Sequence, residues 1–508
     1  MDFLMSTTVI ASSTLLSRIF GLIRDIFFAK YLGTGSASDV FFASYRLPNF
    51  FRTLFAEGAF SATFVPILSA QMVDKNREEM LKFLKNMFSL LLYFILTFSL
   101  LAEIFMPQIV GVVVSGFSTD VEKYKLTVVL SRITFPYIIL ISLTSFMSGI
   151  LHSHGKFLIV ALNPIILNLV FILTSALSPL FSLDISQLLA QAVLIGGFLQ
   201  FLSVFLAVTG RKIVLYPGKV KIDQTTKKFA KNFSSALLSS GIDQINSIIS
   251  SIMLSKTAGA ISLVYYADRL VQLPSSLIGT ALGISLLPLL SRKIRQNDGD
   301  RFRLQENALL TALFLGLPAM FYLYKLSYIF VPVLFERGEF TGASSMAVVR
   351  CTKIYACALP VFILSKVLQS IFFSNGDTKT PMISALISLF SNIALALILR
   401  KYFGYEGVLI SSALSAYLDF ISLLVILLIR KRLILSERFL LIFVKIVYAL
   451  VFLILSAAIC SKFVPMGQTL TSRLLKLTIT AFLSGIVYLT ISYLIGIVSL
   501  KKYAPTNL

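Results

Sequence analysis

Long apolar stretches recur along the whole chain, and each is long enough for a helix that crosses a bilayer. The hydrocarbon core of a bilayer requires about 20 consecutive, mostly apolar residues of a helix. The pattern predicts an all-α, polytopic membrane protein. Windowed apolarity predicts about fourteen transmembrane helices, with cores near residues 5–29, 39–67, 86–107, 126–151, 158–180, 187–209, 233–255, 262–289, 307–334, 347–373, 381–399, 405–429, 440–462 and 474–499.

Composition agrees with this fold class and leaves little room for a soluble domain. Of the 508 residues, 57% are hydrophobic and only 13% are charged, whereas soluble proteins carry about 25% charged residues. The longest polar connections, at 211–231 and 291–303, are short enough to be loops or surface helices. Most of the molecular surface is therefore expected to face lipid.

Lysine and arginine gather in every second loop of the predicted order. Because cytoplasmic loops carry the excess of positive charge, we expect these loops to be cytoplasmic. With an even number of spans, both termini are then expected on the cytoplasmic side. The net charge of +22 is explained by these basic loops, which are expected to face anionic lipid headgroups. No nucleic-acid partner is expected, because the chain lacks a stacked-aromatic RNA motif. The basic loops lie around residues 75–82, 156, 211–231, 292–303, 379, 430–438 and 501–502.

The sequence repeats itself at an offset close to 223 residues. Three pairs of segments carry the repeat: FFASYRL (41–47) with VYYADRL (264–270), VPILS (65–69) with LPLLS (287–291), and HSHGKF (152–157) with SNGDTKTP (374–381). Asn168 and Asn392 follow the last pair at matching depth. A six-helix unit has an even number of spans, so two copies share one orientation and form a parallel repeat. We therefore expect an N-lobe at 1–215, a C-lobe at 216–435 and two extra helices at 436–508.

Arginines interrupt several predicted spans. An arginine at the centre of a spanning helix costs about 2.5–3.5 kcal/mol, so four facing lipid would cost on the order of 10 kcal/mol. One interpretation places each arginine near a span end, where it reaches the headgroups. The other places them in a water-filled cavity, and the Ser, Thr and Gly content of the first, second, seventh and eighth spans favours it. The candidates are Arg18, Arg24, Arg52 and Arg269.

Carboxylate and amide residues accompany these arginines at helical spacing. Arg18 and Asp25 lie seven residues apart and so share one helix face. Guanidinium groups suit phosphate, because their planar fork donates two parallel hydrogen bonds. The cluster therefore indicates a phosphorylated or multiply anionic ligand. Its remaining candidate members are Asp39, Asn49, Glu57 and Asp268.

Further oxygen-bearing residues lie in the second half of the chain. Asp243 falls in the seventh span, Asp377 beside the turn after the tenth, and Asn392 in the eleventh. Oxygen ligands suit a hard cation, so one interpretation is a Na⁺ site. The other is an N-cap role for Asp377 and a structural hydrogen bond for Asp243. No other cofactor is expected. The chain has neither a GxxxxGK[ST] phosphate loop nor a Ser/His/Asp set that would indicate an enzyme.

Several long motifs resemble the MviN/MurJ family of bacterial lipid II flippases. The resemblance runs from the first predicted span to the twelfth. The segments are SRIFGLIRDIFFAKYLG (17–33), DVFFASYRLPNFFRTLFAEGAFSATFVPIL (39–68), GILHSHGKF (149–157), YYADRLVQLP (265–274), LLPLLSR (286–292), LFERGEF (334–340) and DTKTP (377–381).

The resemblance implies a fold and a function. The family belongs to the multidrug/oligosaccharidyl-lipid/polysaccharide exporter superfamily, whose flippases have two six-helix lobes plus two extra helices. Members move lipid II, the undecaprenyl-pyrophosphate-linked peptidoglycan precursor, from the cytoplasmic to the periplasmic leaflet by alternating access. A transporter of the bacterial cytoplasmic (inner) membrane, not an enzyme, is therefore expected, with a role in cell-wall biogenesis and cell shape. Its expected partners are lipid II, membrane lipids and the cell-wall synthesis machinery.

By resemblance, specific residues take roles in this transport. The last two helices would form a groove for the lipid tail, and a family Na⁺ site in the C-lobe would lie nearest to Asp243 and Asp377. Asp39 and Glu57 fall in the matching segments. The family's cavity arginines, which bind the pyrophosphate and head group, match Arg18, Arg24, Arg52 and Arg269.

Three alternatives stay open. The chain could flip another polyprenyl-linked saccharide, or export cationic drugs as other members of the superfamily do. A drug exporter should have an acidic cavity, whereas this one is basic. A membrane glycosyltransferase for the same precursor would need a carboxylate base beside an acceptor site, and the sequence pattern contains no such arrangement.

Overall fold

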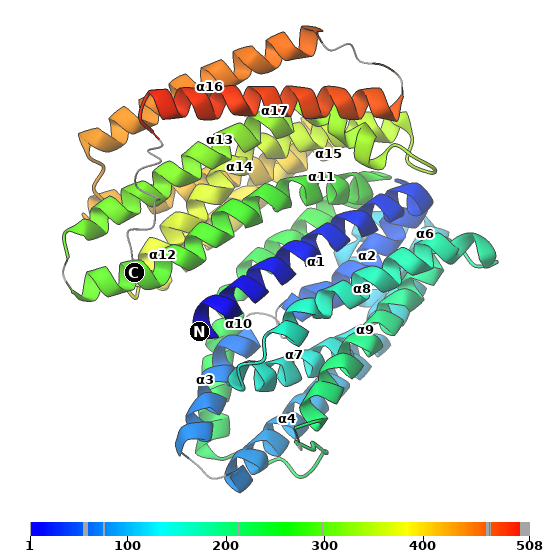
Figure 1. The fold of residues 1–508 in the computed structure, drawn as a ribbon. Coiled ribbons are helices and arrows are strands. Elements are labelled where there is room, and N and C mark those ends of the chain that lie inside the picture. The colour runs from blue at the N-terminus through cyan, green and yellow to red at the C-terminus, as the bar shows by residue number, and fades with distance from the viewer. Residues whose placement is uncertain are drawn as a thin grey trace. The chain divides into compact units, whose positions relative to one another are not determined.

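The computed structural model describes residues 2–53, 59–74, 77–211, 213–296, 298–463, 467 and 469–497, which form helices and their connections and contain no strand. The all-α prediction is confirmed. The α-helices (Figure 1) are α1 (Asp2–Leu32), α2 (Ser36–Arg52), α3 (Ala59–Asp74), α4 (Arg77–Ile104), α5 (Met106–Val113), α6 (Val121–Thr134), α7 (Tyr137–Ser153), α8 (Leu158–Leu177), α9 (Ile185–Thr209), α10 (Gln224–Leu254), α11 (Ala260–Pro274), α12 (Ala281–Arg295), α13 (Asp300–Phe335), α14 (Gly342–Ser374), α15 (Lys379–Ile429), α16 (Glu437–Phe463) and α17 (Leu470–Leu494).

The chain forms two compact units. Unit 1 comprises Met1–Ser262 with Arg337–Phe340, and unit 2 comprises Leu263–Glu336 with Thr341–Leu508. In unit 1, α10 packs against α3 and α5, so this helix joins the first unit although the repeat assigns it to the second half. The lobe boundaries expected from the repeat stay a prediction.

Aromatic rings and a close glycine contact bring the helices of unit 1 together. Phe28, Phe41 and Phe171 meet edge to face where α1, α2 and α8 pack, with ring centroids 5.2, 5.6 and 6.2 Å apart. On α9, Gly197 lies against the ring of Tyr137, and a Cβ there would collide with that ring. Small residues let membrane helices approach closely, which explains a glycine at this crossing.

Unit 2 is built around α14, which packs against α12, α13 and α15. A Cβ on Gly279 would lie 3.1 Å from Ile363 Cα of α14, and one on Gly283 would lie 3.1 Å from Ser370 Oγ. The GxxxG spacing thus serves tight helix packing. Just before it, Pro274 ends α11 and a π-helical turn follows, as expected where proline removes a helical hydrogen bond.

Long apolar helices confirm a multi-pass membrane protein. Helix α15 has 51 residues, about 76 Å of α-helix, whereas a hydrocarbon core is about 30 Å thick. Gly404, with φ 57° and ψ −137°, breaks it between two expected spans. The total of fourteen spans stays a prediction. The described candidates are Arg77–Ile104, Val121–Ser153, Leu158–Leu180, Ile185–Thr209, Ala260–Arg295, Asp300–Phe335, Gly342–Ser374, Lys379–Ile429, Glu437–Phe463 and Leu470–Leu494.

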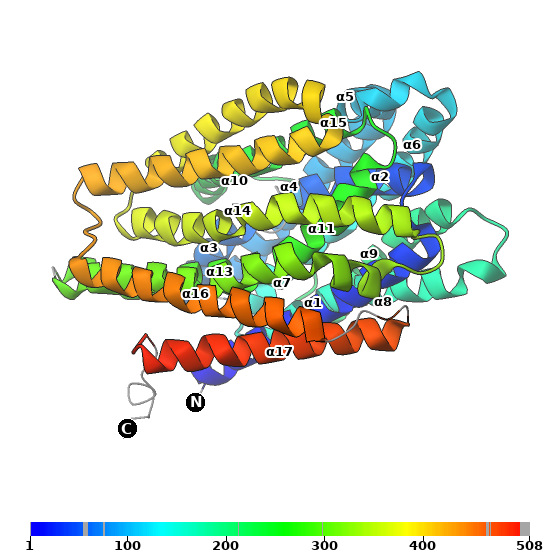
Figure 2. The ribbon, with the colours of Figure 1, turned by 90° about the horizontal axis from the view of Figure 1, so that it is seen from above.

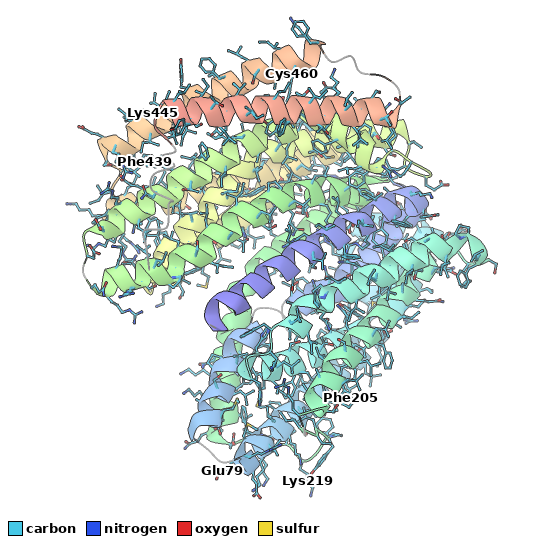
Figure 3. All side chains as sticks on the ribbon, viewed as in Figure 1. Glu79, Phe205, Lys219, Phe439, Lys445 and Cys460 are labelled. Carbon is cyan, nitrogen blue, oxygen red and sulfur yellow. The ribbon has the colours of Figure 1, made fainter. Side chains whose placement is uncertain are left out.

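Helices α16 and α17 pack against each other and against α13. Figure 2 shows them side by side, and Figure 3 places Lys445 and Cys460 toward opposite ends of α16. Ala449 and Leu453 of α16 share a buried apolar cluster with Tyr488 of α17. The two C-terminal helices therefore form a packed layer on unit 2.

Candidate functional site

Arg24 is buried inside unit 1, where side chains of α1 and α8 contact its guanidinium group. The residue is 9% exposed, and its Nε and Nη2 atoms donate to Asp25 Oδ1 at 3.0 and 2.8 Å. Its Nη1 atom donates to Asn168 Oδ1 on α8 at 2.9 Å, and the guanidinium carbon lies 5.5 Å from the centre of the Phe28 ring. Protein oxygens thus engage both sides of the guanidinium fork, which offsets the desolvation of a buried charge.

Helix α2 brings two further guanidinium groups into unit 1. The Nε atom of Arg52 donates to Asn49 Oδ1, one turn earlier on the same helix, at 2.8 Å. The Nη2 atom of Arg46 donates to Ser247 Oγ on α10 at 2.9 Å. Arg46, Asn49 and Arg52 are all half-buried, so α2 presents cations where water is scarce.

The other arginine candidate of unit 1 is Arg18, which is half-buried on α1. It lies six residues before Arg24, about 9 Å along the helix axis. Glu57 lies outside the described residues. Unit 1 therefore contains Arg18, Arg24 and Arg52, and the fourth candidate arginine belongs to unit 2.

Arg269 lies on α11 of unit 2. Its Nη1 atom donates to Gln272 Oε1 at 2.8 Å, and its guanidinium carbon lies 4.9 Å from the centre of the Tyr265 ring. Arg269 is half-buried, whereas Asp268 is exposed. Successive helical residues point about 100° apart, so Asp268 and Arg269 occupy different faces of α11.

Asp39 is fully buried on α2 and surrounded by donors of unit 1. Its Oδ2 accepts from Lys123 Nζ at 3.1 Å and from the backbone N–H of Gly259 at 2.7 Å. Its Oδ1 accepts from the backbone N–H and the hydroxyl of Ser262, both at 3.0 Å. Lys123 lies in turn 4.0 Å from the centre of the Phe117 ring. A carboxylate at the start of α11 is favoured by the helix dipole. This geometry indicates that Asp39 stabilises the packing of α2 against the start of α11.

Asp377 caps the start of α15. Its oxygens accept from the backbone N–H and hydroxyl of Thr380 at 3.0 and 2.9 Å, and from Arg430 and Arg432 at 2.7 and 3.0 Å. Partial burial opposes ionisation of Asp377, but the hydrogen bonds from Thr380 and the two arginines outweigh it and hold the pKa below the ordinary value. The N-cap interpretation of this residue accounts for its geometry.

Two of the three Na⁺ candidates, Asp377 and Asn392, are not brought together. Asn392 is 1% exposed and its Oδ1 accepts from Ser411 Oγ at 2.8 Å. It lies 15 residues after Asp377, about 22 Å along α15, so one ion cannot contact both. The side chain of Asp243 lies outside the described residues. Within the described part of the chain, no three His, Cys, Asp or Glu side chains gather as metal ligands.

The sequence matches a family model over most of its length. The model is described as "Lipid II flippase MurJ" and matches residues 28–494. The chain belongs to this family. Membership confirms the resemblance carried by the motifs. It also confirms a transporter rather than an enzyme, because flippases move their cargo without converting it.

Relatives in the MurJ family match both units of the chain. The probable lipid II flippase MurJ of Rickettsia prowazekii (strain Madrid E) is 36% identical over 419 residues, 82% of each chain. That of Rhizobium tropici is 36% identical over 430 residues, 84% of this chain and 81% of its own. That of Buchnera aphidicola subsp. Acyrthosiphon pisum (strain APS) is 31% identical over 501 residues, 98% of each chain.

Solved structures agree with the family fold. A lipid II flippase MurJ in an inward closed conformation matches with a TM-score of 0.80 and 27% identity, over 96% of this chain and 98% of the other. An inward-facing multidrug resistance MATE transporter matches with a TM-score of 0.64 and 13% identity, over 86% and 98% of the two chains. The second likeness concerns the fold alone.

Two charged residues of this MurJ-family chain were not predicted from the sequence. Arg46 occupies the place in FFASYRL that Arg269 occupies in VYYADRL, so the repeat contained the signal. The sequence predicts that Lys123 lies in a connecting segment. In the structure it is 8% exposed and pairs with Asp39. Its partner lies 84 residues away in sequence, a separation that helix periodicity cannot bridge.

Proposed function

We propose that this chain moves lipid II from the cytoplasmic to the periplasmic leaflet of the bacterial cytoplasmic membrane. The observation that carries the proposal is the family match over residues 28–494, with relatives at 36% identity whose names describe probable lipid II flippases. Both termini face the cytoplasm in this proposal. The distribution of Lys and Arg among the loops supports that orientation.

The pyrophosphate of lipid II binds to Arg24 and Arg52, with Arg18 and Arg269 as further contacts. In the structure, Arg24 is engaged by the carboxylate of Asp25 and, at Nη1, by the neutral amide of Asn168. A neutral partner interacts less strongly with a guanidinium group than an ionised one. The pyrophosphate therefore displaces Asn168 from Nη1 more readily than it displaces Asp25.

The remaining parts of the proposal concern the lobes, the tail and the driving ion. Lobes at 1–215 and 216–435 alternate access to the cargo, and the helices of 436–508 bind its lipid tail. Large apolar side chains exposed on α16 and α17, including Phe463 and Phe482, support contact with lipid. Na⁺ coupling at Asp243 and Asn392 is tested by replacing Na⁺ with K⁺ in a transport assay. Contact with the cell-wall synthesis machinery is tested by crosslinking in cells.

The alternative cargo is another polyprenyl-linked saccharide, because its pyrophosphate offers the same chemistry to the arginines. Competition between lipid II and other polyprenyl-linked sugars for the purified chain separates the two. The alternative of a drug exporter is supported by fold likeness alone. The half-buried arginines of unit 1 would repel a cationic cargo.

A depletion–complementation experiment with a leaflet assay tests the function. The host's own flippase is depleted, the chain is supplied, and lipid II on the periplasmic face is measured. We expect the unaltered chain to restore transport. Arg24→Ala, Arg52→Ala and Arg269→Ala should each lower it by about tenfold or more, as for loss of one charge-assisted hydrogen bond. The exposed Arg303→Ala serves as the charge-matched control.

The outcomes separate the function from the site. If lipid II stays in the cytoplasmic leaflet with the unaltered chain, the proposed function fails. If all three arginine variants transport normally, the arginine site fails although the function stands.

A further inference from the structure

A cavity of about 530 Å³ lies in unit 1, on elements that carry none of the arginine candidates. Its walls come from the end of α3, the start of α4, the turn after α7 and the segment after α9. Its volume falls within the range of about 300–1,000 Å³ that ligand pockets occupy. The cavity is lined by Met72, Arg77, Met80, His154, Arg211 and Ile213.

The cavity is cationic. Arg211 is half-buried and Arg77 is exposed, and in the ranges the structure describes neither forms an ion pair with a carboxylate. Glu78 and Glu79 follow Arg77 on α4, but successive helical residues point about 100° apart, so they do not share its face. A half-buried guanidinium without a carboxylate partner favours an anionic ligand.

The start of a helix adds directional partners for an oxyanion. Helix α4 begins at Arg77, and the first N–H groups of a helix lack intrahelical acceptors and favour anions. The Nδ1 atom of His154 lies 2.8 Å from the carbonyl oxygen of Ile150. A carbonyl only accepts, so Nδ1 carries the hydrogen and Nε2 of the neutral ring is an acceptor. His154 therefore lines the cavity without donating to an anion.

The cavity lies at the level where spans meet water. The span Arg77–Ile104 begins at its wall, Val121–Ser153 ends beside His154, and Ile185–Thr209 ends just before Arg211. Figure 3 places Glu79 and Lys219 at this same end of unit 1. Met80 and Ile213, 8% and 3% exposed, give the cavity an apolar floor. This combination suits a phosphate carried on an apolar stem.

We propose that this cavity is a phosphate-binding site in which Arg77 and Arg211 hold the phosphate. The phosphate belongs either to an anionic phospholipid headgroup or to a soluble phosphate. The span ends and the apolar floor favour the lipid headgroup. The site is separate from transport of lipid II, so the proposal stands or falls independently of the proposed function.

The test uses the full chain and one engineered fluorophore. The sequence contains no tryptophan, so Met72→Trp places a single reporter in the cavity wall. The protein is reconstituted in phosphatidylcholine vesicles that contain a minor fraction of brominated phosphatidylglycerol or, in parallel, brominated phosphatidylcholine. We expect the anionic lipid to quench the reporter more strongly. Each arginine should contribute about fivefold to this preference, the effect of one basic side chain near a charged membrane surface.

Variants assign the preference to the cavity. Arg77→Gln with Arg211→Gln should abolish it, and Arg77→Lys with Arg211→Lys should retain part of it. Lys227→Gln with Lys228→Gln removes two exposed charges outside the cavity and should leave it unchanged. Equal quenching by both lipids in the parent overturns the proposal. The proposal is also overturned if the cavity and control variants lose the lipid preference equally, or if the preference survives in the double Gln variant. Thermal unfolding verifies that each variant is folded.

Competition distinguishes the two sources. Inorganic phosphate is titrated against sodium chloride of equal ionic strength. Relief of quenching by phosphate alone indicates a site that also accepts soluble phosphate. No relief by either salt indicates the lipid headgroup. Equal relief by both salts indicates general screening of surface charge and overturns the proposal.

Discussion

Lys476 of α17 donates a hydrogen bond from Nζ to the carbonyl oxygen of Ser461, near the end of α16, at 3.0 Å. At the other end of the same pair, Lys445 of α16 donates to the carbonyl oxygen of Ile495 at 2.7 Å. Each lysine thus serves a C-terminal carbonyl of the other helix, where the helix dipole favours a cation. The two contacts fix the register of the antiparallel pair.

Removal of Lys476 should loosen this pair. Lys476 is 6% exposed, so Lys476→Ala deletes both a charge-assisted hydrogen bond and a buried aliphatic stem. We expect the free energy of unfolding to fall by about 1–3 kcal/mol, measured by thermal unfolding in detergent. The exposed Lys462→Ala on α16 is the control and should change little. Equal stability of the two variants would show that the buried contact does not matter.

Asp39 should prove to be a structural residue. Its ion pair with Lys123 is almost completely buried, and breaking such a pair leaves an uncompensated charge. Asp39→Asn should therefore lower the free energy of unfolding by about 3–5 kcal/mol. A ligand-binding role predicts the reverse pattern, in which stability is kept and lipid II transport is lost. Thermal unfolding and the leaflet assay, run on the same preparation, distinguish the two.

A double-mutant cycle sharpens this test. Lys123→Met removes the charge that Asp39→Asn leaves behind, so adding it to that variant should recover part of the lost stability. Coupled residues in contact show interaction energies of about 0.5–3 kcal/mol. Strict additivity of the two single changes would contradict the ion pair as the source of stability.

The helices could be predicted because bilayer thickness and helical periodicity act locally along the chain. The break of α15 at Gly404 falls between the spans predicted at 381–399 and 405–429. Partner choice is different, because it depends on the packing of distant segments. Helical spacing predicts that Asp25 shares a face with Arg18. In the structure Asp25 pairs with the adjacent Arg24, although neighbours along a helix do not face each other. That geometry depends on Asn168, which α8 supplies.

Asn168→Asp should weaken lipid II binding. The change keeps the shape of the side chain but replaces a neutral amide by a carboxylate at Arg24, whose Nη1 atom donates to Asn168 Oδ1. The pyrophosphate must then displace an ionised group from Nη1, where the parent has a neutral amide. We expect affinity for lipid II to fall by about tenfold or more, with no loss of thermal stability. Native mass spectrometry with lipid II measures the affinity.

Asn168→Ala separates charge from shape in this experiment. It removes the acceptor without adding an anion, so binding should fall less than in Asn168→Asp. If both variants bind lipid II as well as the parent, Arg24 does not hold the pyrophosphate.

The contribution of Asp377 to stability should depend on pH. Its pKa in the folded chain is lowered from the ordinary value of 3.8, so its ionised form stabilises the fold. That contribution is complete above the unfolded pKa and is lost as the pH falls through the folded pKa. Asp377→Asn should therefore unfold at a lower temperature than the parent at neutral pH, and the difference should shrink below pH 3.8. Glu437→Gln, an exposed change on α16, controls for general charge effects. A difference that persists unchanged in acid would contradict the ionised cap.

The candidate site could be predicted only as far as residue type and helix face decide it. Two interpretations of Asp377 fitted the sequence equally, because a carboxylate beside a turn suits both an N-cap and a cation. Arg430 and Arg432, which donate hydrogen bonds to Asp377, lie more than 50 residues away along the chain. The sequence likewise leaves the partners of Asp39 undefined, because its donors at the start of α11 lie more than 200 residues away along the chain.

Gly338 should not tolerate a side chain, because its backbone conformation and its contact with Lys30 both require glycine. Its φ is +59°, and a Cβ there would collide with the carbonyl oxygen of Lys30, which accepts from the backbone N–H of Glu339 at 2.9 Å. Gly155 has a similar φ of +68° with open space around it. Gly155→Ala should cost about 1–2 kcal/mol from the left-handed conformation alone. Gly338→Ala should cost about 1–3 kcal/mol more, because the segment must shift. Thermal unfolding compares the two, and hydrogen exchange should rise at Glu339 only in Gly338→Ala. Equal effects in both would mean that the contact with Lys30 contributes nothing.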